Sequence, residues 1–440
     1  MLARANEPGE VGAVTPPSTT TAPRWWPARI YYGWAMVATL GFTATVSYGV
    51  LVYAFAVFIT PMGAELGWSK ARITGAFSVA QLVAGVTAVP LGRWVDRHGA
   101  RGVMTSGSIL ATVLLVGWSR VESLPAFYAV WALIGVASAA VLYEPAFAIV
   151  ATWFRRDRSQ ALTLLTFIGG FASVVFVPLT TVLVERFGWR DALLWLAAVS
   201  AVFTVAPHAL VLRRRPADLG LAPDGIVRLD PAPSVVEPAL VATEFGTPAA
   251  DAIRTRTFRW LTVAFALSAF TVTAIMVHLV PLLRERGYSA GFAGGAMGVL
   301  GLMALPGRLI FTPLGGRWSR VRVTALIFAL SVLALVTLLV SHAAAAVWVF
   351  VVLFGAGFGA ITPARAALIA DSFGVASYAE ISGVLAFVLS LARATAPVGA
   401  SALYEATQGL PVARYDAVLV VLASLGVGSV AAVLVAQRRS

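Results

Sequence analysis

Long apolar segments alternate with short polar segments along most of the chain. A helix that crosses a bilayer needs about 20 apolar residues, and twelve segments come close to this length or exceed it. In the first half of the chain these segments are 33–59, 72–92, 103–119, 125–150, 160–184 and 191–212. In the second half they are 260–283, 291–314, 322–341, 344–370, 378–402 and 415–436. The pattern predicts an all-α membrane protein with twelve transmembrane helices.

A polar stretch separates the sixth apolar segment from the seventh. Residues 213–256 begin with three consecutive arginines and continue with proline, aspartate, alanine and glutamate. We therefore predict two pseudo-symmetric six-helix bundles, 30–212 and 257–440, joined by a cytoplasmic linker. Residues 1–29 have no apolar core, so we expect a disordered cytoplasmic tail and no cleavable signal peptide.

The two halves share a turn sequence at matching places. The segment 90–94 reads PLGRW after the second apolar segment, and 313–318 reads PLGGRW after the eighth. Because the position within each half is the same, the match indicates a duplicated six-helix unit.

The composition agrees with a surface that faces lipid. Hydrophobic residues make up 59% of the chain and charged residues 12%, whereas soluble domains carry about 25% charged residues. The net charge is +12, but the basic residues are spread between apolar segments, so we expect no nucleic-acid partner. The chain has no cysteine, which excludes disulfides, cysteine metal sites and thiol nucleophiles.

The arginines indicate an orientation. With the N-terminus inside, the loops on the inner side hold most of the arginines, as transmembrane proteins prefer. The inner arginines are Arg24, Arg29, Arg93, Arg97, Arg101, Arg155, Arg156, Arg158, Arg213, Arg214, Arg215, Arg317, Arg320, Arg322, Arg438 and Arg439. We predict a multi-pass protein of the cell inner membrane with both termini in the cytoplasm.

The sequence offers little for enzyme chemistry. It contains no G-x-x-x-x-G-K phosphate loop and no H-E-x-x-H metal pair, and its four histidines are far apart. We expect a transporter without cofactor or bound metal. A membrane-bound enzyme and a non-transporting sensor with a transporter fold are the alternatives from other classes.

The loop after the second segment carries the strongest motif. Residues 92–101 read G-x-x-x-D-R-x-G-x-R, where the glycines allow a tight turn and the charges can pair. Here the chain resembles the major facilitator superfamily, whose signature loop has this form and place. The resemblance implies a conformational latch, and the alternative interpretation is a solvated run of charges. The latch residues would be Gly92, Asp96, Arg97, Gly99 and Arg101.

Two further motifs narrow the resemblance. Tyr32-Gly33-Trp34 opens the first segment, and Trp153-Phe154-Arg155-Arg156 leads into the fifth, followed by Ala161, Gly169 and Gly170. Both look like the monocarboxylate-porter and oxalate–formate-exchanger branch. This resemblance implies a monomeric secondary transporter of a small organic anion, a mono- or dicarboxylate. It would work by alternating access, through proton symport or exchange.

Arg308 and Arg393 lie inside apolar segments, where a charge is costly and suggests function, whereas Arg365 lies near a cytoplasmic end and is expected to be structural. A guanidinium fork can pair bidentately with a carboxylate. The resemblance implies that Arg308 binds the substrate carboxylate and that Arg393 does related work, and the alternative is a structural role at helix ends. Monocarboxylate porters have an acid four residues before the first arginine, but this chain has Ala304. Their mode of proton coupling therefore does not carry over.

Other polar residues in apolar segments are weaker candidates. Glu144, within Tyr143-Glu144-Pro145, could carry a coupling proton or pair with a cavity arginine, and the alternative is a partner such as Arg155 or a group on another helix. Tyr48 and His278 are further candidates for the substrate cavity. A drug or metabolite efflux pump of the same fold is the alternative function. Intramembrane arginines favour the anion transporter.

Overall fold

The structure is a computed structural model, which describes residues 30–225, 246–407 and 414–437. Within these residues the chain is helical apart from loops and one isolated bridge between Gly246 and Gly374. The predicted tail 1–29, the middle of the linker at 226–245 and the last three residues lie outside the described residues.

Each half of the chain contributes its own set of helices. The first half contains α1 (Tyr32–Tyr48), η1 (Gly49–Tyr53), α2 (Phe55–Leu66), α3 (Lys70–His98), α4 (Ala100–Ser119), α5 (Leu124–Val141), α6 (Tyr143–Trp153), α7 (Arg158–Gly169), α8 (Ala172–Ser200), η2 (Ala201–Val205) and α9 (Ala206–Leu210). The linker contains η3 (Pro216–Leu219), η4 (Pro223–Gly225) and α10 (Ala249–Arg254). The second half contains α11 (Arg256–Glu285), α12 (Ala290–Arg317), α13 (Arg320–Val340), α14 (Ala344–Phe373), α15 (Tyr378–Ala406) and α16 (Arg414–Gln437).

Among the described residues, eleven helical stretches are long and apolar enough to cross a membrane. The longest, Arg158–Leu210, has 53 residues and contains both the fifth and the sixth predicted segments. It reverses direction at Gly188, where φ is +78°. Arg190 donates to the carbonyl of Ser119 at the end of α4, whereas Arg214 lies against Gly99 at its start. The stretch therefore doubles back along α4, and counting it as two helices gives twelve.

Local sequence explains where several helices begin. Ser69, Thr255 and Ser319 are N-caps, and each side-chain oxygen accepts a hydrogen bond from the backbone N–H three residues later. Such caps satisfy amide groups that the first turn of a helix leaves without a partner. Within the apolar segments, lipid offers the backbone N–H and C=O groups no hydrogen-bonding partner. The chain therefore satisfies these groups internally by forming helices.

Two apolar clusters hold the helices together. The larger cluster contains buried residues of both halves and includes Trp118 and Trp131, whose rings meet edge to face with centroids 4.9 Å apart. The second cluster lies within the second half around Phe350 and Phe354, which stack at 5.1 Å.

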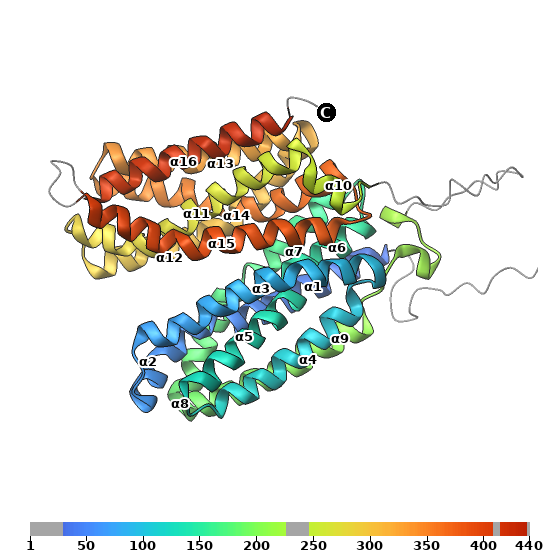
Figure 1. The fold of residues 1–440 in the computed structure, drawn as a ribbon, viewed down its shortest axis with the longest axis horizontal. Coiled ribbons are helices and arrows are strands. Elements are labelled where there is room, and N and C mark those ends of the chain that lie inside the picture. The colour runs from blue at the N-terminus through green and yellow to red at the C-terminus, as the bar shows by residue number, and fades with distance from the viewer. Residues whose placement is uncertain (1–29, 226–245, 408–413, 438–440) are drawn as a thin grey trace, which may run out of the picture.

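Small residues bring the two halves into close contact. In Figure 1 the blue-to-green helices of the first half and the yellow-to-red helices of the second form two groups, with α3 running beside α15. A Cβ added at Gly92 would meet the backbone of Ala379 at 2.3 Å, and one added at Gly383 would meet the backbone of Ala88 at 2.5 Å. Only residues without a side chain permit this approach between helices in a membrane.

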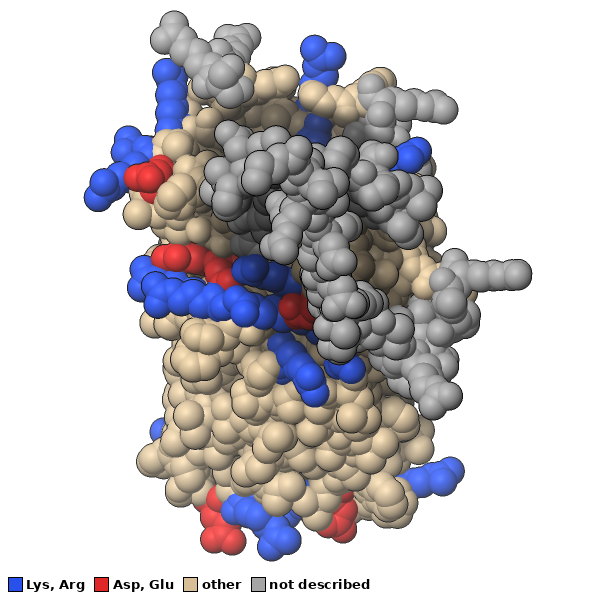
Figure 2. Space-filling view, turned by 90° about the vertical axis from the view of Figure 1, so that its right-hand side faces the viewer, with Lys and Arg blue, Asp and Glu red and all other residues tan. Residues whose placement is uncertain are grey.

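Charged side chains gather where the two halves meet at one end of the molecule. We call this the arginine-rich end and define it by Arg93, Arg158 and Arg320. Figure 2 shows basic and acidic side chains in a band across the middle of this face, above a largely apolar region. The band lies where the halves join, so its ion pairs can tie one half to the other.

Candidate functional site

Two helices that face the join between the halves are interrupted. Leu142 has an extended backbone (φ −83°, ψ −157°), which separates α5 from α6 within the fourth predicted segment. The first segment contains the π-helical turn η1 directly after Tyr48. The two interruptions meet, since the rings of Tyr48 and Tyr143 lie 4.6 Å apart. Interrupted helices and π turns are common at transport and binding sites.

Arg308 extends from α12 of the second half to the first half. Its guanidinium donates to the carbonyl of Thr166 on α7 and is a hydrogen-bonding partner of the Tyr143 hydroxyl. A Cβ at Gly170 would collide with its Nη1. The Arg308 guanidinium therefore occupies space that a side chain at residue 170 would fill.

Glu144 pairs with an arginine of the opposite half. Arg365 Nη2 on α14 lies 2.5 Å from Glu144 Oε1 on α6, and the Arg365 side chain is 9% exposed. The second carboxylate oxygen of Glu144 is buried without a hydrogen-bond partner among the described residues. The sequence had suggested Arg155 as an alternative partner, but Arg155 stands at the arginine-rich end. Arg365 was not among the predicted site residues, although an arginine in an apolar segment was signal enough.

Arg393 completes this group from α15. It is exposed, yet its electrostatic neighbours Arg365, Tyr48 and Glu144 come from three other helices. Arg393 is therefore accessible while its electrostatic neighbours come from both halves. Tyr53 is 40% exposed and lies within electrostatic range of Arg308. We call the whole group the central cluster, which consists of Tyr48, Tyr53, Tyr143, Glu144, Arg308, Arg365 and Arg393.

Of the predicted substrate and coupling residues, His278 is not brought into the central cluster. Its ring contacts the carbonyl of Pro397, the hydroxyl of Ser401 and the hydroxyl of Tyr415. These partners all belong to the second half, so His278 joins α11, α15 and α16.

The central cluster has more positive than negative charge. It holds three guanidinium groups, which stay protonated in proteins, against the single carboxylate of Glu144. This excess of two positive charges gives the central cluster the electrostatic character of an anion-binding site. In the part of the chain that the structure describes, no group of three or more His, Asp or Glu could hold a metal ion.

The predicted latch loop makes direct contact with the second half. Both oxygens of Asp96 accept hydrogen bonds at the start of α15, from the N–H groups of Ala379 (3.0 Å) and Glu380 (2.9 Å). A helix N-terminus favours such a negative charge. Beside it Arg93 Nε lies 2.6 Å from Glu380 Oε1, and Gly92 allows the backbones to touch. Arg93 was not among the predicted latch residues.

Of the other three latch residues, Arg97 and Gly99 contact the start of the linker. The carbonyl of Arg97 accepts from the Arg214 guanidinium, and Gly99 (φ +84°) lies against the same side chain. Arg101 is exposed and lies within electrostatic range of the Tyr32 hydroxyl. The loop thus links the second half on one side to the start of the linker on the other.

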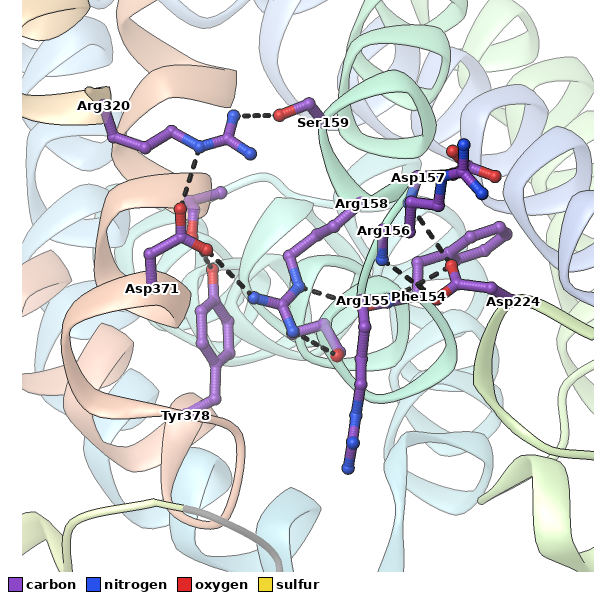
Figure 3. A network of polar contacts seen from close by, with 12 residues as sticks. Phe154, Arg155, Arg156, Asp157, Arg158, Ser159, Asp224, Arg320, Asp371 and Tyr378 are labelled. Carbon is purple, nitrogen blue, oxygen red and sulfur yellow. Dashed lines mark hydrogen bonds and ion pairs between the residues drawn. The ribbon is translucent and has the colours of Figure 1, made fainter. Parts of the chain in front are cut away.

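A second set of ion pairs joins the halves at the same end (Figure 3). Asp371 on α14 accepts from Arg158 Nη1 of α7 at 3.2 Å and from Arg320 Nε of α13 at 2.8 Å. Arg320 also donates to Ser159 of the first half. In the sequence, both arginines stood out only as inner-side charges. Their common partner is far away in the chain, so no local pattern could reveal it.

Comparison with known proteins places the chain in a family. The model of the Major Facilitator Superfamily matches residues 40–397. The chain is 29% identical to Monocarboxylate transporter 13 of Bos taurus over 63% of its own length and 60% of that protein. It is 24% identical to the Oxalate:formate antiporter of Oxalobacter formigenes over 54% of its length and 53% of the antiporter. The chain therefore matches less than two thirds of either relative.

Solved structures share the fold. FucP in its outward conformation superimposes with a TM-score of 0.66 at 13% identity, covering 93% of this chain and 100% of FucP. The human organic anion transporter MFSD10 (TETRAN) gives 0.65 at 15% identity, covering 91% and 99%. The family match includes the latch loop and all seven residues of the central cluster. This multi-pass membrane protein belongs to the Major Facilitator Superfamily, in the branch of the monocarboxylate transporters and the oxalate:formate antiporter.

Proposed function

We propose that the chain is a secondary active transporter that carries a small organic anion, a mono- or dicarboxylate, across the cell inner membrane. The observation that carries this proposal is the excess of two positive charges in the central cluster. The names of the relatives, a monocarboxylate transporter and an oxalate:formate antiporter, support the same substrate class.

Arg308 and Arg393 would hold the anion from the second half, each offering a planar fork to a carboxylate. The hydroxyls of Tyr48, Tyr53 and Tyr143 can donate further hydrogen bonds from the first half. An anion bound in this way is shared by both halves. Its binding therefore stabilises the arrangement in which the halves close around it.

Transport would follow by alternating access, with two six-helix bundles rocking about the central cluster. The contacts of Asp96, Arg93 and Asp371 would close the arginine-rich end in one state and break in the other. The bias of the arginines supports a cytoplasmic position for this end and for both termini. We expect the chain to act as a monomer within the bilayer.

Glu144 is our candidate for coupling. A substrate carboxylate that attracts Arg365 would weaken the Glu144–Arg365 pair, and a buried carboxylate deprived of its partner takes up a proton. This order of events yields proton symport. If Glu144 stays ionised throughout, the same cluster would exchange one anion for another.

A thermal-shift screen of the purified protein tests the substrate class. The panel contains short monocarboxylates, dicarboxylates, aromatic acids and lipophilic cations, with Arg308→Gln in parallel. A ligand that binds the native state raises the melting temperature by mass action. We expect a carboxylate to raise the melting temperature of the native sequence and to raise that of Arg308→Gln much less at the same concentration.

The alternative is an efflux pump for drugs or metabolites. The three tyrosines of the central cluster favour it, because aromatic faces bind lipophilic cations. Stabilisation by such cations that is unchanged in Arg308→Gln would support the pump and overturn the anion transporter.

A further inference from the structure

Asp224, in the short linker turn η4, binds the connection between α6 and α7. Its carboxylate accepts hydrogen bonds from three consecutive backbone N–H groups, those of Arg155 (3.0 Å), Arg156 (2.9 Å) and Asp157 (3.3 Å), as Figure 3 shows. Among the described residues, Asp224 is the single non-glycine with a positive φ, at +61°. This conformation is uncommon and unfavourable outside glycine, so the surrounding contacts must maintain it.

The three N–H groups directly precede α7, which begins at Arg158. Asp157 occupies the N-cap position of α7, and its side chain makes no capping hydrogen bond. The first amides of a helix lack partners within it, and a negative charge there interacts favourably with the helix dipole. The Asp224 carboxylate thus binds the N-cap amide of α7 and the two amides before it, so its negative charge lies beside the positive end of the helix dipole.

Tyr31, which lies just before α1, packs against both the connection between α6 and α7 and the linker turn η4. Its hydroxyl donates to the carbonyl of Trp153 at 2.9 Å, and its ring meets Phe154 edge to face at 5.5 Å. The ring also lies against Gly225, where a Cβ would come within 2.8 Å. Burial, and then the negative charge of Asp224, raise the pKa of the Tyr31 phenol, so this donor keeps its proton.

The turn that Asp224 binds also positions Arg158. The Arg158 guanidinium donates through Nε to the carbonyl of Phe154 at 3.0 Å and through Nη2 to that of Ala151 at 3.2 Å. Its remaining nitrogen, Nη1, reaches Asp371 of the opposite half at 3.2 Å. The Arg158 side chain is 9% exposed, so it has little freedom to find Asp371 from another backbone position.

We propose that Asp224 is a positioning residue for the contact between the halves, through which the linker favours closure of the arginine-rich end. Residues 223–225 hold the α6–α7 turn in the shape that directs Arg158 at Asp371. Release of Asp224 would leave three amides without their acceptor, loosen the turn and weaken the Arg158–Asp371 pair. The inference goes beyond the proposed function and does not depend on which solute is carried.

Cysteine accessibility tests this inference without any substrate. The natural chain has no cysteine, so Ala367→Cys provides a single reporter. Ala367 is 3% exposed on α14, and it lines a pocket between the halves with Ser159 and Arg320. Its rate of alkylation by a maleimide should rise when the halves separate at the arginine-rich end.

In the Ala367→Cys protein we expect Asp224→Ala to raise the alkylation rate about tenfold, the equivalent of one charge-assisted hydrogen bond. Asp224→Asn should have a smaller effect, because the amide oxygen still accepts. Asp218→Ala is the matched control, since the Asp218 carboxylate bonds within the linker to the N–H of Arg215 at 3.0 Å. We expect no change there, and an unchanged rate in Asp224→Ala would overturn the proposal.

Two further measurements separate positioning from general destabilisation. A second reporter, Ala334→Cys, is fully buried in the cluster of the second half, and Asp224→Ala should leave its rate unchanged. An equal rise at both reporters would contradict the proposal. Asp371→Asn should raise the rate at Ala367→Cys, and adding Asp224→Ala should then change little. Independent, additive effects would show that Asp224 does not act through Arg158 and Asp371.

Discussion

Glu144 and Arg365 form an ion pair between the two halves, with Nη2 of the arginine 2.5 Å from Oε1 of the glutamate. Neither residue has a charged neighbour in sequence, and they come together only because α6 and α14 face each other. The pair lies in the same cluster as Arg308 and Arg393. A change in its protonation therefore alters both the charge offered to an anion and the attraction between the halves.

We expect Glu144→Gln to remove the pH dependence of uptake, because the amide cannot take up or release a proton. The change should also lower stability by about 3 kcal/mol, since it leaves the buried Arg365 without its counter-charge. Uptake into liposomes over a range of external pH, with thermal melting, checks both effects.

Two variants control this experiment. Arg365→Gln added to Glu144→Gln should recover part of the lost stability, because the uncompensated charge is removed as well. Glu122→Gln changes an exposed glutamate before α5 and should leave the pH profile unaltered. A pH profile in Glu144→Gln that matches the natural protein would exclude Glu144 as the coupling acid.

Arg308→Gln should weaken carboxylate binding by about 2 kcal/mol or more, roughly thirtyfold in affinity. Arg308→Lys should fall between the two, because an ammonium keeps the charge but not the planar fork. Titration of a stabilising carboxylate by calorimetry measures the affinity. Arg72→Gln, at an exposed arginine of α3, is the control. Native affinity in Arg308→Gln would refute the assignment.

Asp96→Ala should loosen the arginine-rich end more than Arg93→Ala. Asp96 accepts two backbone hydrogen bonds at the start of α15, and charge-assisted bonds contribute about 1.5–3 kcal/mol. Arg93 is 58% exposed, and such surface pairs contribute about 0–1 kcal/mol. Alkylation of Ala367→Cys in each variant compares them. A faster alkylation in Arg93→Ala than in Asp96→Ala would show that Asp96 is not a main contact of the latch.

Gly92→Ala should disfavour the closed arginine-rich end, because its Cβ would stand 2.3 Å from the backbone of Ala379. Backbone cannot move aside as a flexible side chain can, so α3 and α15 must separate. Gly102→Ala, ten residues later on α4, meets nothing within 4 Å and should stabilise its helix by about 0.5–1 kcal/mol. Gly92→Ala should lower the melting temperature and raise the alkylation rate of Ala367→Cys. Gly102→Ala should raise the melting temperature and leave the alkylation rate unchanged. Similar behaviour would argue against close packing at Gly92.

That the chain crosses a membrane many times, and that it resembles the superfamily, could be predicted from the sequence alone. Long apolar segments have few ways to satisfy their backbone in lipid, so hydrophobic length alone predicts helices. The motif at residues 92–101 could also be found in the sequence, since a short turn between consecutive helices is a local feature. The cost of burying a charge was also enough to single out Arg308, Arg393 and Glu144 from the sequence alone.

Which of these residues come into contact depends on the packing of the helices. Partners such as Glu144 and Arg365, or Arg158 and Asp371, are more than two hundred residues apart, and no periodicity relates them. The hydrogen bonds of Asp224 to the turn before α7 depend on a linker turn that folds back onto the first half. His278, like the arginines, is a polar residue in an apolar segment, yet its hydrogen-bonding partners lie outside the central cluster. Such contacts arise from how helices pack across the two halves, and that packing is a property of the whole chain.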